Sequence, residues 1–360
     1  MPVSRRNFAR LSAASAAVAV ASPAIAQQAT IKWRLASSFP KNLEGLWGAS
    51  PTVAKFVHEM TDGKFEIQPF AAGEIVPGLQ VLDAVQNGTV ECGHSYSGYY
   101  VGKNPALIFD GSLPFGLTPR QHNAWYLFGD GKKLIDDLYD GFSVVSIPMG
   151  NTGGQTFGWF RKEIKSPADF NGVKMRVAGF GGRVLAKLGV VPQQIAAGDI
   201  YPALEKGTID AAEWVGPYDD EKLGFYKVAP YYYYPGWWEG GSMLFAFINN
   251  DKWNALPKHY QATLANAAAY ANTWCMAKYD LANPAALRRL LGNGVKLNGF
   301  SPVIMEACYK SAMELHGEIA KENASFKKVN DSMTDYMRNG YQWFQVAELG
   351  YDSFMVRHLR

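Results

Sequence analysis

The sequence has 360 residues, of which 48% are hydrophobic and 19% are charged, a composition typical of a globular protein. The formal net charge is only +3, and no run of lysine and arginine is longer than two residues. The chain therefore lacks the basic footprint with which proteins bind nucleic acids or anionic membranes. Its length is sufficient for two lobes that each have a hydrophobic core.

The amino terminus has the features of an export signal. Arg5 and Arg6 precede Phe8, an apolar stretch of small residues covers 11–20, and an Ala-x-Ala site ends at Ala26. The apolar stretch is shorter than the roughly 20 residues that span a bilayer. Paired arginines followed by phenylalanine are typical of the twin-arginine pathway, and an ordinary secretion signal that contains two arginines is the alternative. We predict a signal peptide over residues 1–26, cleaved after Ala26, and a periplasmic protein without membrane insertion.

Removal of this signal changes the charge of the chain. Arg5, Arg6 and Arg10 are its only charged residues. They account for the whole formal excess, so the mature chain is close to neutral.

The first part of the mature chain alternates strands and helices. Ile31, Trp33 and Leu35 alternate with polar residues, as in a strand, and the apolar spacing from Leu46 to Met60 predicts a helix. The pattern predicts further strands and helices in the following order: a strand at 65–70, a helix at 79–86, a strand at 90–94, a helical region at 119–139 and a strand at 142–148.

The same alternation continues over residues 155–239, and the chain becomes mainly helical beyond Pro257. The predicted strands lie at 158–160, 173–177, 190–194 and 211–215, and the predicted helices at 182–188, 200–206, 259–291, 302–320 and 332–354. Alternation with short connections is typical of α/β proteins with mostly parallel sheets. In such folds the ligand lies in a crevice beyond the carboxyl ends of the strands.

We therefore predict two α/β lobes with a ligand cleft between them and a helical C-terminal extension. The predicted boundaries are 27–150 plus about 241–290 for lobe 1, 151–240 plus later helical segments for lobe 2, and about 300–360 for the C-terminal helices.

The three cysteines, Cys92, Cys275 and Cys308, lie far apart in the sequence and do not have metal-ligand spacing. One disulfide could form in an oxidising compartment. We expect buried free thiols instead, since a chain of this size needs no covalent cross-link.

Motifs of the common enzyme classes are missing from the sequence. The six histidines are dispersed, and there is no nucleophile elbow, Walker loop or dinucleotide fingerprint. The glycine-rich segment 179–182 lacks the spacing of a phosphate loop, so a hinge or a close approach of two backbones explains it better. These absences favour binding over catalysis, although they do not exclude an enzyme.

Polar and aromatic residues gather instead at predicted strand ends and turns. Arg176 ends a strand, where its guanidinium could bind a carboxylate through two hydrogen bonds, and a surface ion pair is the alternative. Glu213 and Trp214 lie at the end of another predicted strand, and a polar turn over 151–155 joins the two blocks. The aromatic run over 231–241, taken alone, is explained mostly by core packing.

Five blocks of the sequence, in order, resemble the extracytoplasmic solute-binding proteins of TRAP transporters, which are tripartite carriers driven by an ion gradient. The blocks are WRLASSFP, AAGEIVPGLQVLDAVQNGTVE, FRKEIKSPADFNGVKMRV, IYPALEKGTIDAAE and YYYYPGWWEGG. They span nearly all of the mature chain, and EWVGPYDDEKLGF and PGWWEGG are shared with receptors for α-keto acids. The resemblance implies the two-lobe fold of periplasmic binding proteins. It also implies a receptor, not an enzyme, that binds a small 2-oxo monocarboxylate such as pyruvate or 2-oxobutyrate for membrane subunits of a TRAP transporter.

The resemblance assigns roles to individual residues. Arg176 would hold the substrate carboxylate, and a cation, Na⁺ or alternatively Ca²⁺, would bind with the substrate. The cation ligands would be the Gln155 amide, the Glu213 carboxylate and the Trp214 carbonyl, with Glu239 bordering the site. Oxygen ligands of this kind suit hard cations. The full predicted substrate-binding set is Arg176, Gln155, Glu213, Trp214, Asn151, Ser95, Tyr99, Tyr100 and Glu239.

The resemblance also implies a moving, dimeric receptor. The hinge would lie near 151–154 and 240–241, and the C-terminal helices resemble a dimerising extension. Packing of these helices against the chain's own lobes is the alternative.

Three functional alternatives remain: a receptor of the same family for lactate or another carboxylate, an exported enzyme acting on keto acids, and a scaffolding protein. The order of residues 96–98 departs from the family pattern, so the resemblance does not define the part of the pocket that holds the tail of the ligand.

Overall fold

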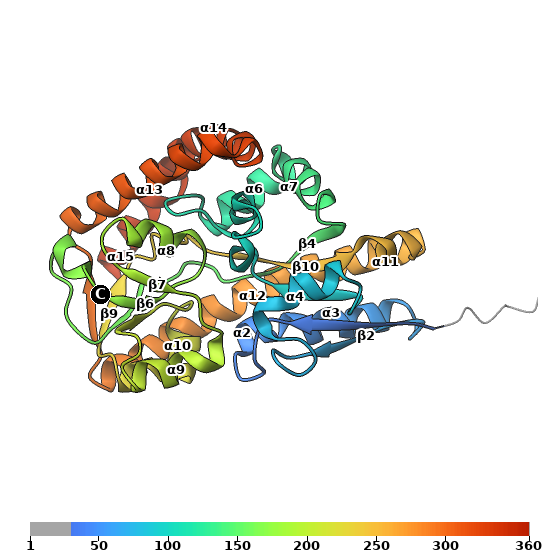
Figure 1. Cartoon of the computed structure of the whole chain (residues 1–360), viewed down its shortest axis with the longest axis horizontal. Coiled ribbons are helices and arrows are strands. Elements are labelled where there is room, and N and C mark those ends of the chain that lie inside the picture. Colours follow the sequence, from blue (N-terminus) through green and yellow to red (C-terminus); the bar gives the residue numbers. More distant parts are fainter. Residues whose placement is uncertain (1–29, 360) are drawn as a thin grey trace, which may run out of the picture.

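The computed structural model describes residues 30–359, so the predicted signal peptide lies outside the described residues. Two sheets surrounded by helices form the body of the molecule (Figure 1). Within residues 30–359, none of the helices combines the length and the apolar character that crossing a bilayer requires.

The first sheet has five strands in the order β2-β1-β3-β10-β4. They are β1 (Ile31–Ser37), β2 (Phe65–Phe70), β3 (Cys92–Ser95), β4 (Val144–Asn151) and β10 (Met243–Asn249). Four strands run in one direction, and β10 lies antiparallel between β3 and β4. All seven residues of β10 are buried, as expected for a central apolar strand.

The second sheet has six strands in the order β11-β9-β5-β8-β6-β7. They are β5 (Gly158–Phe160), β6 (Lys174–Arg176), β7 (Val191–Gln193), β8 (Ala211–Ala212), β9 (Tyr231–Tyr234) and β11 (Lys296–Gly299). Only β5 is reversed. Both sheets are thus mixed by one reversed strand each, and the predicted α/β fold with mostly parallel strands is confirmed.

Helices cover both sheets. Those near the first sheet are α2 (Glu44–Trp47), α3 (Ala49–Met60), α4 (Val81–Gln86), α5 (Ile108–Gly111), α6 (Pro119–Phe128), α7 (Gly131–Asp140) and α11 (Asn250–Ala255). Those near the second sheet are α8 (Gly179–Ala186), α9 (Ala197–Glu205) and α10 (Pro217–Leu223). The long helix α12 (Lys258–Gly292) contacts β4, α3 and α10, so it packs against parts of both sheets.

Two extended segments and α12 carry the chain between the sheets. The segments between β4 and β5 and between β9 and β10 lie side by side, because the Thr152 N–H donates to the Ser242 carbonyl at 3.0 Å. Gly241 has a φ of +153°, and a Cβ there would lie 2.6 Å from the Gly153 carbonyl oxygen. Only glycine fits so close an approach of two backbones. The predicted hinge falls on these connections.

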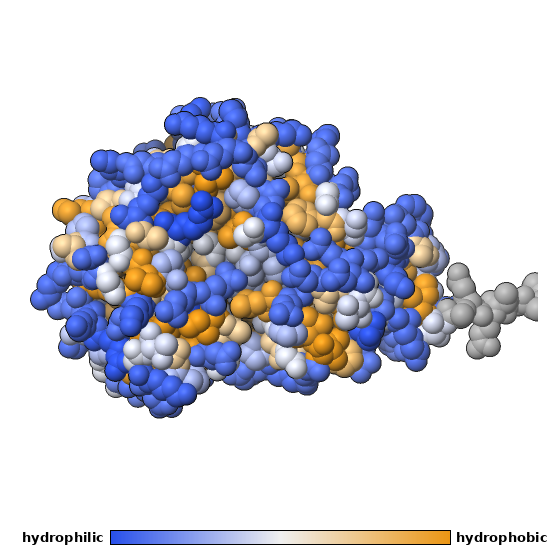
Figure 2. All heavy atoms as spheres, viewed as in Figure 1, coloured by the Kyte–Doolittle hydropathy of each residue, from blue (hydrophilic) through white to orange (hydrophobic). Residues whose placement is uncertain are grey.

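The C-terminal extension consists of α13 (Pro302–Glu322), α14 (Ala324–Phe344), a π-helical turn (Gln345–Leu349) and α15 (Gly350–His358). The first two helices pack on the chain itself: α13 contacts α8, and α14 contacts α6 and α7. Their outer surface, at the upper edge of the view, is mostly hydrophilic (Figure 2). In contrast, α15 has no buried residue.

Several boundaries differ from those predicted. The helical region 119–139 is broken into α6 and α7, and the predicted helix 332–354 contains the π-helical turn. The sequence patterns did not reveal α10, β9, β10 or β11. The three cysteines are free and buried, as predicted.

Candidate functional site

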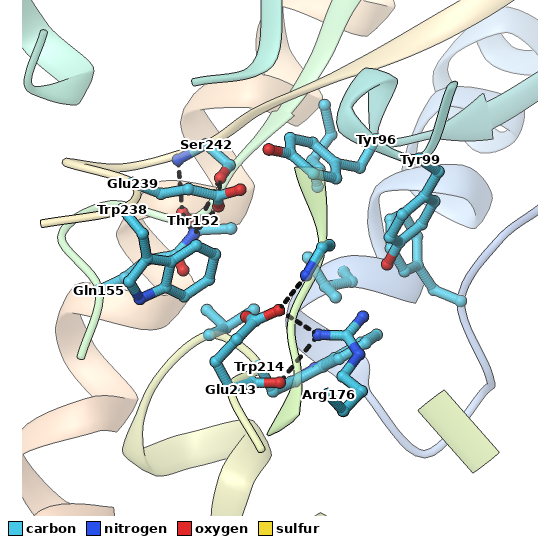
Figure 3. Close-up of a pocket in the computed structure, with 15 residues that line it drawn as sticks. Tyr96, Tyr99, Thr152, Gln155, Arg176, Glu213, Trp214, Trp238, Glu239 and Ser242 are labelled. Carbon is cyan, nitrogen blue, oxygen red and sulfur yellow. Dashed lines mark hydrogen bonds and ion pairs between the residues drawn. The ribbon is translucent and has the colours of Figure 1, made fainter. Parts of the chain in front are cut away.

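A pocket lies where the two sheets meet, beside the connections between them (Figure 3). Its empty volume is about 320 Å³, which includes space open to solvent. The pocket combines apolar and aromatic walls with a few convergent polar and charged groups, which is typical of a site for a small molecule. The lining residues are Phe39, Leu46, Tyr96, Tyr99, Thr152, Gln155, Arg176, Ala178, Glu213, Trp214, Val215, Trp238, Glu239, Ser242 and Leu244.

Arg176 stands at the end of β6 and is only 2% exposed. Its Nε donates to the Ile195 carbonyl at 3.1 Å, and Nη1 donates to the carbonyl and to Oε1 of Glu213 at 2.8 and 2.5 Å. The guanidinium carbon lies 4.8 Å from the centre of the Trp214 ring. Among the described residues Nη2 has no hydrogen-bond partner. The pair with Glu213 is therefore buried, unlike the surface ion pair that the sequence left open, and Nη2 is the donor free for a ligand.

Glu213 follows the short strand β8 and lies beside Arg176 in the pocket wall (Figure 3). Its Oε1 also accepts the Ala178 N–H at 2.8 Å, and its own N–H donates to the Arg176 carbonyl at 3.1 Å. Burial raises the pKa of Glu213 to about 8, while the Arg176 charge acts in the opposite direction. These neighbours fix the position of the Glu213 carboxylate, and a further positive charge nearby would stabilise its ionised form.

A second polar group lies opposite this pair. Gln155 Nε2 lies within hydrogen-bond distance of Thr152 Oγ1, Glu239 Oε2 and Ser242 Oγ, at 2.9, 3.0 and 3.0 Å. The Ser242 hydroxyl also donates to Glu239 Oε2. Burial raises the pKa of Glu239, and the surrounding donors oppose this shift. With Nε2 engaged in this way, the amide orientation of Gln155 is set.

The oxygen of the same amide has no partner. Gln155 Oε1 is buried without a hydrogen-bond donor among the described residues. A buried acceptor without a donor is costly, unless a ligand or an ion satisfies it. Its place in the lining, together with Glu213 and Trp214, makes a cation the natural partner.

The donor chemistry decides which cations fit. Among residues 30–359 there is no group of three or more His, Cys, Asp or Glu side chains that could hold a metal. The site instead offers an amide oxygen, a backbone carbonyl and one or two carboxylates. Such sets suit hard cations of the Na⁺ or Ca²⁺ kind, so the residues fit the predicted ion.

The structure brings most of the predicted site residues together. Tyr99, Gln155, Arg176, Glu213, Trp214 and Glu239 line the pocket. Ser95, Tyr100 and Asn151 do not line it.

These three residues support the pocket wall from behind. Ser95 Oγ bonds to the hydroxyls of Ser38 and Tyr100 at 2.6 and 2.8 Å, which ties both side chains into the first sheet. Asn151 Oδ1 accepts the Gly153 N–H at 2.9 Å and thereby shapes the turn between β4 and β5.

Nine lining residues were not predicted. Tyr96, Thr152, Trp238 and Ser242 neighbour predicted residues or lie within the quoted motifs, so the motifs could have indicated them. Phe39 and Val215 also lie within quoted motifs, whereas Leu46, Ala178 and Leu244 give no signal in the sequence because any core residue has the same character.

Comparison with known proteins gives a consistent result. The family model described as bacterial extracellular solute-binding protein, family 7, matches residues 45–323. The monocarboxylate 2-oxoacid-binding periplasmic protein of Nostoc sp. is 51% identical over 324 residues, which is 90% of this chain and 89% of that protein.

Two solved structures are also similar. A TRAP transporter solute-binding protein from Bordetella bronchiseptica is 50% identical, with a TM-score of 0.91 over 92% of this chain and 98% of that one; it is a mixed-occupancy dimer with copurified calcium and picolinate. A TRAP periplasmic solute-binding protein from Pseudoalteromonas atlantica, with bound sodium and pyruvate, is 37% identical, with a TM-score of 0.88 over 90% and 99% of the two chains.

Proposed function

Because the chain belongs to family 7 of the bacterial extracellular solute-binding proteins, the receptors of TRAP transporters, we propose that it binds a small 2-oxo monocarboxylate together with Na⁺ or Ca²⁺. Members of this family are receptors and not enzymes. The observation that carries the proposal is the pair of unused groups in the pocket: the Arg176 Nη2 donor and the Gln155 Oε1 acceptor. A carboxylate satisfies the first group, and a cation satisfies the second.

A 2-oxo acid with a cation can satisfy both the Arg176 donor and the Gln155 acceptor. A 2-oxo acid carries a carboxylate next to a carbonyl oxygen, so one end can accept hydrogen bonds from Arg176 Nη2. Gln155 Oε1, the Glu213 carboxylate and the Trp214 carbonyl are the proposed cation ligands, with Glu239 at the border. A bound cation supplies positive charge that both ligand oxygens can share. Pyruvate and 2-oxobutyrate are the preferred candidates.

The charges in the pocket can be balanced. Arg176 and Glu213 offset each other, and a monocarboxylate offsets a monovalent cation. Pairing of this kind reduces the cost of removing each charge from water when the pocket closes.

Two other ligand types offer a carboxylate with a neighbouring donor atom. Lactate and other 2-hydroxy acids carry a hydroxyl in place of the carbonyl. Picolinate, found in the Bordetella protein, carries a ring nitrogen at the equivalent place. The apolar part of the lining, with Phe39, Leu46 and Leu244, would accept the remainder of any of these ligands.

We propose that the lobes close over this ligand. Lobe 1 would comprise 27–150 and about 241–290, lobe 2 would comprise 151–240 with later helical segments, and the C-terminal helices would follow from about 300. Contacts between the two proposed lobes support a closed state: Tyr218 Oη on α10 donates to Glu44 Oε2 on α2 at 2.8 Å, and Gln194 Nε2 donates to the Tyr99 carbonyl at 3.1 Å. The closed surface is the one that the membrane subunits would recognise.

We further propose twin-arginine export with cleavage after Ala26, and a homodimer. The exposed apolar residues near the C-terminus support the dimer, since a single chain leaves them uncovered. They are Trp343, Val346, Leu349, Tyr351, Phe354, Val356 and Leu359, exposed by 54–78%.

Calorimetry with pyruvate, 2-oxobutyrate, lactate and succinate, each with and without Na⁺ or Ca²⁺, tests the function. We expect one mole of 2-oxo acid bound per chain, a strong dependence on the cation, and weak binding of succinate. NMR spectra of the ligand after overnight incubation should be unchanged. Product formation, or binding that ignores the cation, would refute the proposal.

A further inference from the structure

The Trp214 carbonyl belongs to a peptide unit that is held from behind. The nitrogen of this unit is the Val215 N–H, which donates to Asp220 Oδ1 at 3.3 Å. The one cis peptide bond within residues 30–359 precedes Pro235. The Trp214–Val215 unit is therefore trans and planar, and its C=O points opposite to its N–H. Consequently the bond to Asp220 turns the carbonyl of Trp214 away from Asp220.

The other side of this unit is the pocket. Trp214 and Val215 both line the pocket, whereas Asp220 does not. Across the described part of the chain, no group donates a hydrogen bond to the Trp214 carbonyl. The Val215 carbonyl accepts the Thr156 N–H at 3.2 Å, and the Glu213 carbonyl accepts a hydrogen bond from Arg176 Nη1 at 2.8 Å, so the loop is fixed on both sides of the Trp214 oxygen.

Asp220 is itself held firmly. It is 0% exposed, and its Oδ2 accepts hydrogen bonds from Trp159 Nε1 on β5 at 2.9 Å and from the Tyr232 hydroxyl on β9 at 2.7 Å. Its partners are thus three neutral donors that converge on one carboxylate. The second sheet therefore anchors Asp220, and Asp220 anchors the loop that carries Glu213 and Trp214.

A carboxylate at position 220 can accept all three hydrogen bonds, because both of its oxygens are acceptors. Its burial among neutral donors is nevertheless unfavourable, and the three hydrogen bonds offset only part of this cost. An asparagine would turn its NH₂ group towards one or more of the donors. The carboxylate charge also polarises the hydrogen-bonded peptide unit, which places more negative charge on the Trp214 oxygen. Partners behind a metal ligand tune metal affinity in the same way.

We propose that Asp220 is a positioning residue for the cation. Through the Val215 N–H it aims the Trp214 carbonyl into the pocket and strengthens that oxygen as a cation ligand. This inference rests on the proposed function, because it requires that the Trp214 carbonyl binds the ion.

The Asp220→Asn variant tests this role in titrations with pyruvate at a series of Na⁺ and Ca²⁺ concentrations. We expect the half-saturating cation concentration to rise about tenfold or more, as for other partners of metal ligands. Pyruvate affinity at saturating cation should stay close to that of the wild type. Asp110→Asn is the matched control: Asp110 is equally buried, accepts the Tyr139 hydroxyl at 2.6 Å, and does not line the pocket. Its cation midpoint should not change.

A merely structural role gives a different result, in which Asp220→Asn weakens pyruvate binding equally at all cation concentrations. That result, or a cation midpoint equal to that of the wild type, overturns the inference. If the wild-type protein itself binds pyruvate without a cation, the proposed function fails instead.

A measurement on the wild-type protein covers the case in which Asp220→Asn does not fold. In protein labelled with ¹⁵N-valine, the Val215 resonance is assigned by its loss in Val215→Ile. Addition of Ca²⁺ with pyruvate should shift this resonance downfield, because coordination of the Trp214 oxygen polarises the same peptide unit. An unchanged Val215 resonance in protein that binds both ligands would overturn the inference.

Discussion

At the residue scale, Arg176 shows both what the sequence reveals and what it hides. Its position at a strand end identified it as a candidate for carboxylate binding, and the structure buries it in the pocket wall. The sequence could not show that Nε and Nη1 are already engaged by Ile195 and Glu213. These partners lie 19 and 37 residues away, and only the folded sheet brings them together. The remaining donor, Nη2, restricts how a carboxylate can bind.

We predict that Arg176→Ala lowers pyruvate affinity about 30-fold or more, since loss of one member of a buried charge pair costs about 2–5 kcal/mol. The change removes the Nη2 donor and leaves Glu213 buried without its partner. Calorimetry measures the affinity. Arg176→Lys keeps the charge without the planar group and should bind with intermediate affinity.

The matched control is Arg289→Ala, because Arg289 forms an ion pair with Glu221 on the surface and its side chain is 54% exposed. It should bind pyruvate like the wild type. If Arg176→Ala also binds like the wild type, Arg176 is not part of the site.

At the element scale, the sequence predicted those elements whose signals are local. The strands β2 and β5 begin and end at the predicted residues, and α12 differs from its prediction by one residue at each end. The strand β10 was not predicted, although six of its seven residues, MLFAFIN, are apolar, as in a central buried strand; in the structure it pairs with β3 and β4. The run of tyrosines in β9 was attributed to packing, and it is also a strand between β11 and β5.

In a single chain, none of the residues of α15 is buried, and several of its apolar side chains are exposed. We predict that truncation after Phe344, which removes the π-helical turn and α15, converts a dimer into a monomer in light-scattering measurements. Pyruvate affinity should not change, because every residue that lines the pocket precedes Phe245. The loss of the ion pair between Arg120 and Glu348 should matter little, since both side chains are exposed.

Leu281→Lys is the control for this truncation, because Leu281 is an 81% exposed apolar residue on α12 outside the C-terminal extension. That variant should remain dimeric. A monomeric full-length chain, or a dimer that persists after truncation, would show that α15 does not form the interface.

At the scale of the whole molecule, the pocket exists because two sheets meet at three connections. The sequence indicated two blocks and a crevice between them, and the resemblance to a known family indicated six of the fifteen residues that line the pocket. Local patterns could not indicate Leu46 and Leu244, which enter the pocket from two distant parts of the chain. The depth of the pocket and the size of its ligand are therefore properties of the assembled fold.

The central claim is that a 2-oxo acid and a cation share this pocket, and a crystal structure of the protein with pyruvate and Ca²⁺ tests it most directly. We predict Ca²⁺ at about 2.3–2.6 Å from Gln155 Oε1, the Glu213 carboxylate and the Trp214 carbonyl. The pyruvate carboxylate should lie against Arg176 Nη2. Pyruvate bound in the pocket without an ion, or an ion bound by other residues, would contradict the claim.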